Sequence, residues 1–131
     1  MGGHGGVNQL LGQAYFLDML GDAYNGLGRH DEAIVALSEA AASFAQHGAQ
    51  YAHAECLFKI AQSHLAMGRT SQGVTCLRDC LPIFRELHLP EHEAEALRVL
   101  DRLAPASTAP ASAVPGRTAP ARSAPVRTAR T

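Results

Sequence analysis

The sequence contains no tryptophan, and its few phenylalanines and tyrosines bring the aromatic content to only 5%. Sheet proteins draw their cores largely from aromatic and β-branched side chains, so this scarcity argues against an all-β fold. Hydrophobic residues nevertheless make up 47% of the 131 positions, and much of that share is alanine. Because alanine has the highest helix propensity, the composition favours a small all-α domain.

Long hydrophobic runs are also missing. The beginning, MGGHGGVNQL, has no basic segment followed by an apolar one, and no stretch is long enough to cross a bilayer. We therefore expect neither a secretory signal nor contact with a membrane. The three cysteines are then expected to be reduced thiols, which predicts a cytoplasmic protein.

Charge is nearly balanced, at −1, but it is unevenly distributed. Residues 104–131 hold four of the 11 basic residues and none of the 12 acidic ones, so they carry +4 and the rest carries −5. Proline recurs every five residues from Pro105 to Pro125, and large apolar side chains are almost absent there. This composition predicts a disordered tail. Four arginines without aromatic neighbours are poor support for direct binding to nucleic acid, which we do not expect.

The chain repeats itself at a spacing of 40 residues. The stretch LGRHDEA at 27–33 has its counterpart in MGRTSQG at 67–73. Small or apolar residues coincide at the same spacing: Ala14, Ala54 and Ala94; Leu17, Leu57 and Leu97; Leu20, Ile60 and Leu100; Phe44 and Phe84. A coincidence that falls on packing positions indicates an internal repeat.

Each unit is predicted to be a pair of antiparallel helices. Apolar residues such as Leu17 and Leu20 recur at the spacing of one helix face. Gly28 follows, and glycine readily adopts the left-handed conformation that ends a helix, so we interpret LGR and MGR as turns. The third unit is half present, as one helix that begins at Pro90 and carries Asp101 on a face that is apolar earlier, which suits a cap.

The predicted fold class is therefore all-α, an α–α superhelix of about two and a half helical hairpins. We expect a flexible N-terminus over 1–7, a helical repeat domain over 8–103 and the disordered tail over 104–131. Pro82 conflicts with this pattern, because it falls inside the second helix of the second unit. An interior proline removes a hydrogen bond, so we expect either a bend near Arg78 or a helix broken into two pieces.

Small and apolar residues mark the packing positions of both units. In the first unit they are Leu17, Leu20, Gly21, Tyr24, Leu27, Gly28, Ala33, Leu37 and Ala40. The second unit matches at Leu57, Ile60, Ala61, Gly68, Leu77 and Cys80, with His64 replacing the tyrosine and Gly73 the alanine. These units resemble tetratricopeptide repeats, and the resemblance implies stacked helical hairpins over about residues 8–103.

The long spacing, with FAQHG and FRELHLP at the unit ends, is similar to the C-terminal repeats of bacterial antibiotic-regulatory transcription regulators and their ATPase-containing relatives. The chain departs from them, because there is no length upstream for a DNA-binding domain. It also has no phosphate-binding motif, since its only lysine, Lys59, follows Phe58 rather than a glycine. We interpret it as a free-standing or truncated repeat module.

Residues 88–92, HLPEH, match the H-x-x-E-H pattern of zinc peptidases. Those enzymes need both histidines on one face of a continuous helix, and Pro90 lies between His88 and His92 here. We therefore interpret both as surface histidines of a loop. No Ser-His-Asp order or paired carboxylates predict catalysis, and we expect no enzyme activity, catalytic residue or cofactor.

Cys76 and Cys80 lie four residues apart, so they could hold a metal together with Cys56 or His64. Zinc sites more often use closer cysteine pairs, and Cys80 occupies a small-residue position of the repeat. We therefore predict buried structural thiols and no metal site. His64 is expected to be a hydrogen-bonded packing residue.

The resemblance implies that the first helix of each unit lines a concave groove for a peptide or partner helix. The groove candidates are Tyr15, Asp18, Asp22, Asn25, Glu55, Phe58, Gln62, Leu65, Glu95, Arg98 and Arg102. Relatives that grip acidic C-termini use basic residues there, whereas these are mostly acidic or apolar. A partner that mixes basic and apolar groups is expected, unless the face is merely solvated.

The function implied is a non-catalytic protein–protein interaction module, with a regulatory or scaffold role linked to bacterial transcription regulation. The alternative is a domain that senses a ligand or peptide for a transcriptional regulator. Because about three repeats are normally needed for a stable stack, we expect an exposed apolar edge near Leu10, Leu11 and Phe16. Self-association or docking on another protein would cover it. The basic tail is also expected to fold back onto the acidic groove.

Overall fold

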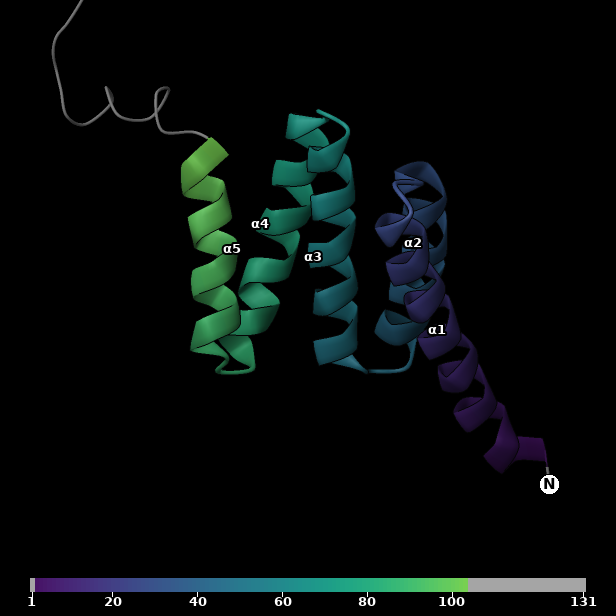
Figure 1. Ribbon diagram of the computed structural model, residues 1–131. Helices are drawn as coiled ribbons and strands as arrows, with labels where there is room; N and C mark the ends of the chain where they lie inside the picture. Colours follow the sequence, from purple (N-terminus) through teal and green to yellow (C-terminus); the bar gives the residue numbers. More distant parts are fainter. Residues whose placement is uncertain (1, 104–131) are drawn as a thin grey trace, which may run out of the picture. The chain divides into compact units, whose positions relative to one another are not determined.

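The computed structural model describes residues 2–103, with side chains from Gly6 onward. These residues form five α-helices and no strand (Figure 1). The helices are α1 (Gly2–Gly26), α2 (His30–Gln46), α3 (Gln50–Ala66), α4 (Thr70–Glu86) and α5 (Pro90–Leu103). This order confirms the all-α repeat of helical hairpins. The predicted tail, 104–131, lies outside the described residues, and α1 begins earlier than the expected domain start at residue 8.

The chain divides into two compact units, one up to Leu97 and one from Arg98 onward. In the first unit α1 packs against α2, α2 against α3, and α3 against α4. Figure 1 shows these four helices running in alternate directions. The described part of the second unit is the end of α5, up to Leu103.

The four turns between helices share one geometry and recur every 20 residues. Their central residues have positive φ angles: Gly28 at 79°, Gly48 at 74°, Gly68 at 78° and His88 at 58°. After each of them an amide donates a hydrogen bond back to a carbonyl in the last turn of the helix: Arg29 to Tyr24, Ala49 to Phe44, Arg69 to His64 and Leu89 to Phe84. These bonds pair carbonyls that a helix end leaves without partners. The predicted turns at Gly28 and Gly68 are confirmed.

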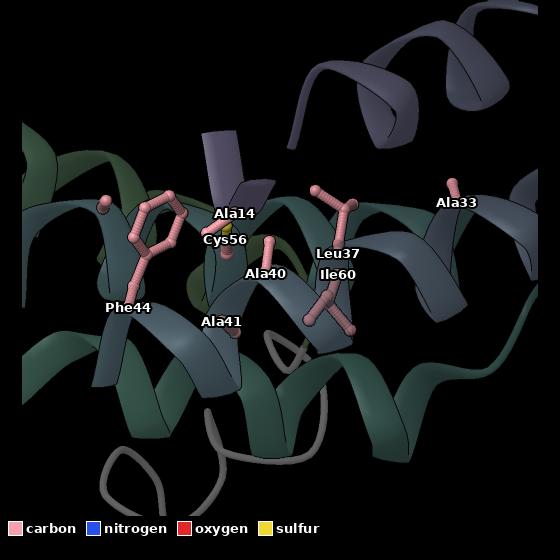
Figure 2. Close-up of a cluster of buried hydrophobic side chains, with 9 residues drawn as sticks. Ala14, Ala33, Leu37, Ala40, Ala41, Phe44, Cys56 and Ile60 are labelled. Carbon is pink, nitrogen blue, oxygen red and sulfur yellow. The ribbon is translucent and has the colours of Figure 1, made fainter. Parts of the chain in front are cut away.

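The main hydrophobic cluster lies among α1, α2 and α3 and consists largely of alanine (Figure 2). Its members are Ala14, Ala33, Leu37, Ala40, Ala41, Phe44, Ala52, Cys56 and Ile60. Leu37 and Phe44 are its largest fully buried side chains, at 0% exposure. Small residues around them let α2 lie close to both neighbouring helices, which explains how a chain with few aromatics builds a core.

Two glycines inside helices mark close approaches. A Cβ atom at Gly21 in α1 would lie 2.4 Å from the side chain of Leu37, and one at Gly73 in α4 would lie 2.6 Å from that of Leu65. Each glycine therefore lets a leucine of the facing helix reach the backbone. Leu65 fills the contact between α3 and α4 in this way.

The helix α4 runs without interruption from Thr70 to Glu86, with Pro82 inside it. The predicted break into two pieces is therefore wrong. Pro82 and Arg78 are both exposed, so the ring and the carbonyl that loses its hydrogen bond lie on the side away from the core. There the defect does not disturb helix packing.

The first helix exposes the apolar edge that the small number of units predicts. Leu10 and Phe16 are 43% and 59% exposed, and Val7, Met19 and Leu27 are exposed as well. Leu11 differs from the prediction, because it is half-buried and packs against the main cluster.

Candidate functional site

One face of α3 carries the side chains of a small pocket. Glu55, Phe58, Lys59 and Gln62 stand at helical spacing, so they share this face. The pocket has a volume of about 180 Å³ and is completed by Phe84 of α4 and by His92 and Glu95 of α5. Four of the predicted groove residues therefore meet there: Glu55, Phe58, Gln62 and Glu95.

Lys59 links this pocket to α1. Its ammonium donates hydrogen bonds to the carboxylates of Asp18 at 2.8 Å and Asp22 at 3.1 Å. Burial disfavours the charge on Lys59 most strongly, but the two carboxylates together outweigh it and raise the pKa of the ammonium. Lys59 therefore stays charged, and Asp18 and Asp22 are occupied in holding it.

The other end of the pocket contains a polar corner between α3 and α5. The Tyr51 hydroxyl donates to Glu55 over 2.7 Å, and the Tyr51 oxygen lies 3.3 Å from Nε2 of His92. The hydrogen bond to Glu55, followed by burial, raises the pKa of Tyr51. The imidazole of His92 also lies against the ring of Phe84, at 5.1 Å between centroids. His92 therefore has a fixed place in the pocket wall.

The remaining predicted groove residues lie elsewhere. The ring of Tyr15 packs edge-on against Phe44 at 4.8 Å, and Asn25 accepts a hydrogen bond from the Ser63 hydroxyl at 2.8 Å. Leu65 packs over Gly73, between α3 and α4. Arg98 and Arg102 belong to the second compact unit.

Sequence reasoning missed Lys59, Phe84 and His92 as pocket residues. Lys59 had a usable signal, because it follows Glu55 by one helical turn on the same predicted face. Phe84 was recognised only as a repeat position, and no local pattern shows that its edge reaches a pocket.

The interpretation of His92 as a loop residue is wrong. α5 begins at Pro90, so His92 lies in its first turn, whereas His88 lies in the preceding turn with a positive φ. The two histidines of HLPEH therefore belong to different elements. Within the described residues, no three histidine, cysteine or acidic side chains form a group that could hold a metal ion.

The prediction of a hydrogen-bonded His64 is not fulfilled at Nδ1. That atom is buried and has no hydrogen-bond partner among the described residues. Burial, followed by the nearby charge of Arg69, lowers the pKa of His64. The imidazole is thus a packing group that favours the neutral form.

The three cysteines carry free thiols. Cys56 and Cys80 are fully buried and Cys76 is half-buried, which confirms the predicted burial for the first two. Burial raises the pKa of Cys56 and of Cys80 to about 12. A thiol that keeps its proton is a poor nucleophile.

We expect Cys56 and Cys80 to react slowly with a thiol reagent in the folded protein near pH 7.5, and quickly in denaturant. Their pKa values are raised on folding, so the stability tied to these thiols is intact below the unfolded pKa of about 8.5. It is lost as the pH rises towards about 12, the folded pKa of both. Urea titrations should therefore show a falling free energy of unfolding above about pH 9. Rapid modification of both thiols in the folded chain would contradict this expectation.

The described helices define a helical-repeat protein whose packed hairpins hold a small lined pocket. A family model of the tetratricopeptide repeat matches residues 12–86, which is more than half of the chain. The chain belongs to the tetratricopeptide repeat family, whose members bind other proteins and peptides. No curated protein and no solved structure matches the chain. None of the described helices is long and apolar enough to span a membrane.

Proposed function

We propose that the chain is a non-catalytic interaction module that binds a segment of another protein in the pocket between α3 and α5. The observation that supports this is the meeting of Glu55, Phe58, Gln62 and Glu95 around one cavity. A pocket of about 180 Å³ is smaller than the roughly 300–1,000 Å³ of usual small-molecule sites. It suits one inserted side chain better than a whole metabolite.

The lining favours a side chain that is both apolar and basic. Phe58 and Phe84 offer ring surface, and Glu55 and Glu95 supply carboxylates. Lys59 already lies between two aspartates, so its positive charge is balanced locally. An arginine or lysine can then lay its stem on the rings and its charge towards a carboxylate.

A peptide with the sequence of residues 112–131, which contains all four arginines of the tail, is a suitable probe. We expect it to bind, and to bind less tightly as salt rises, because exposed charge attraction is screened. Glu55→Gln should weaken binding about three- to tenfold, as expected for the loss of one charge-assisted hydrogen bond of roughly 1 kcal/mol. Isothermal titration calorimetry measures both effects.

The matched control is Glu86→Gln, which removes an exposed carboxylate of α4 outside the pocket and should leave affinity unchanged. A peptide with glutamine at every arginine should bind poorly. Equal binding of the arginine and glutamine peptides would refute the basic-ligand proposal. If the chain's own tail occupies the pocket, deleting residues 104–131 should tighten peptide binding.

We further propose a regulatory or scaffold role in bacterial transcription, in the cytoplasm. This proposal rests on the similarity in repeat spacing to antibiotic-regulatory proteins and on three free cysteines. Affinity capture with the full chain should recover a transcription regulator, and recovery only of unrelated proteins would count against the role. The alternative is a sensing domain, which would require a small molecule to bind with no peptide present.

Self-association through α1 is a second proposed interaction. Its support is the group of exposed apolar side chains on this helix, among them Leu10, Phe16, Met19 and Leu27. Sedimentation equilibrium over a range of concentrations tests it. A chain that remains monomeric throughout would argue against it.

A further inference from the structure

One face of α1 carries an apolar stripe, which we call the α1 seam. It consists of Phe16, Leu20, Ala23 and Leu27, at successive spacings of four, three and four residues. Phe16 and Leu27 are 59% and 69% exposed, Ala23 is exposed and Leu20 is half-buried. Alternate spacings of three and four place residues along the narrow line by which one helix packs on another.

The repeat shows what this face does when a neighbour is present. At the spacing of 40 residues, the α1 seam corresponds to Cys56, Ile60, Ser63 and Met67 of α3. Cys56, Ile60 and Ser63 are buried, at 0%, 6% and 1% exposure. Cys56 and Ile60 belong to the cluster shared with α2, and Ser63 bonds to Asn25 of α1. The first unit thus covers this face of α3, whereas no described residue covers the α1 seam to the same extent.

The order of side chains along the α1 seam suits a second copy of the chain. Its large residues stand at the ends and at one central position, with Ala23 at the other. When two such seams run antiparallel, Phe16 of each copy lies beside Leu27 of the other. Leu20 then lies beside Ala23, so a large side chain meets a small one at the centre.

Charge does not oppose this pairing. Among its described side chains, α1 has charges only at Asp18 and Asp22, and Lys59 of α3 engages both. Two copies can therefore join their seams without burying like charges. Beside the seam, α1 and α2 also form a shallow groove of about 270 Å³, which includes Leu20 and Val35 and extends the apolar surface.

We propose that two copies of the chain pair through the α1 seam with their α1 helices antiparallel. The proposal rests on the self-association proposed above and adds its contact surface and direction. Antiparallel pairing sets Phe16 against Leu27 of the second copy, whereas parallel pairing sets each residue against itself. The two arrangements can therefore be separated by charge exchange.

The test uses two full-length variants, Phe16→Glu and Leu27→Lys, each studied alone and then mixed. Alone, each variant must place a charge against an apolar residue, so its dimer should dissociate at least about tenfold more readily than that of the unchanged chain. In an antiparallel mixed dimer, Glu at 16 meets Lys at 27 and the second contact keeps its original residues. The mixture should then pair at least about tenfold more tightly than either variant alone.

Leu97→Glu is the matched control, because it changes a residue of α5 that is 44% exposed and outside the seam. It should pair as the unchanged chain does. Sedimentation equilibrium measures each dissociation constant, and far-UV circular dichroism shows that every variant remains helical. A monomeric unchanged chain would overturn both the self-association and this inference. A dimer that ignores the seam variants, or that is not restored by mixing, would overturn this inference alone.

Discussion

Replacing Phe44 by alanine is expected to lower the free energy of unfolding by about 3–5 kcal/mol. Phe44 is fully buried in the main cluster, and its ring meets Tyr15 edge-on. Its backbone carbonyl also accepts the hydrogen bond from Ala49 that closes the turn between α2 and α3. Shortening the side chain leaves a cavity among helices that are otherwise joined by alanines, which have no atoms with which to fill it.

Urea denaturation followed by circular dichroism measures this loss. The matched control is Phe16→Ala, which removes the same ring from an exposed position of α1. That change should alter the free energy of unfolding of the monomer by about 0.5 kcal/mol or less. If both variants lost the same stability, the central place of Phe44 in the core would be wrong.

Adding one methyl group at Gly21 should also destabilise the protein, by about 1–3 kcal/mol in Gly21→Ala. In an exposed helix this substitution stabilises, because alanine is the better helix former by roughly 1 kcal/mol. Here the new Cβ would lie 2.4 Å from Cγ of Leu37, a side chain that is itself fully buried. Relief requires α1 and α2 to move apart, and the overlap therefore outweighs the gain in propensity.

Gly12 provides the control on the same helix. A Cβ atom there meets nothing within 4 Å, so Gly12→Ala should raise the free energy of unfolding by up to about 1 kcal/mol. Thermal and urea unfolding of the two variants should therefore show shifts of opposite sign. A stabilised Gly21→Ala variant would contradict the close approach of α1 and α2.

The pattern of helices could be predicted because its causes are local. Gly28 and Gly68 end helices for a reason that each residue carries with it, its freedom to adopt a positive φ. His88 adopts the same conformation without that freedom, so the fourth turn has no comparable local signal. Pro82 shows the opposite limit, since its effect depends on which side of α4 it occupies, and that side is exposed.

The candidate site was only partly predictable. Glu55, Phe58 and Gln62 share a face of one helix, and helical periodicity alone groups them. Leu65 lies one turn further along, yet it is drawn into the contact with α4 because Gly73 leaves room for it there. Which polar groups are already occupied was equally hidden, because Lys59 meets Asp18 and Asp22 from a helix far away in the chain.

Periodicity, glycine positions and the spacing of 40 residues were enough to establish a chain of paired helices and the faces they bury. They could not establish which side chains meet across those faces. Such contacts depend on how far each helix advances and rotates against its neighbour, and one missing Cβ atom or one buried lysine changes that. The pocket of α3 and the uncovered seam of α1 are therefore properties of the assembled helices, although every residue in them was visible from the start.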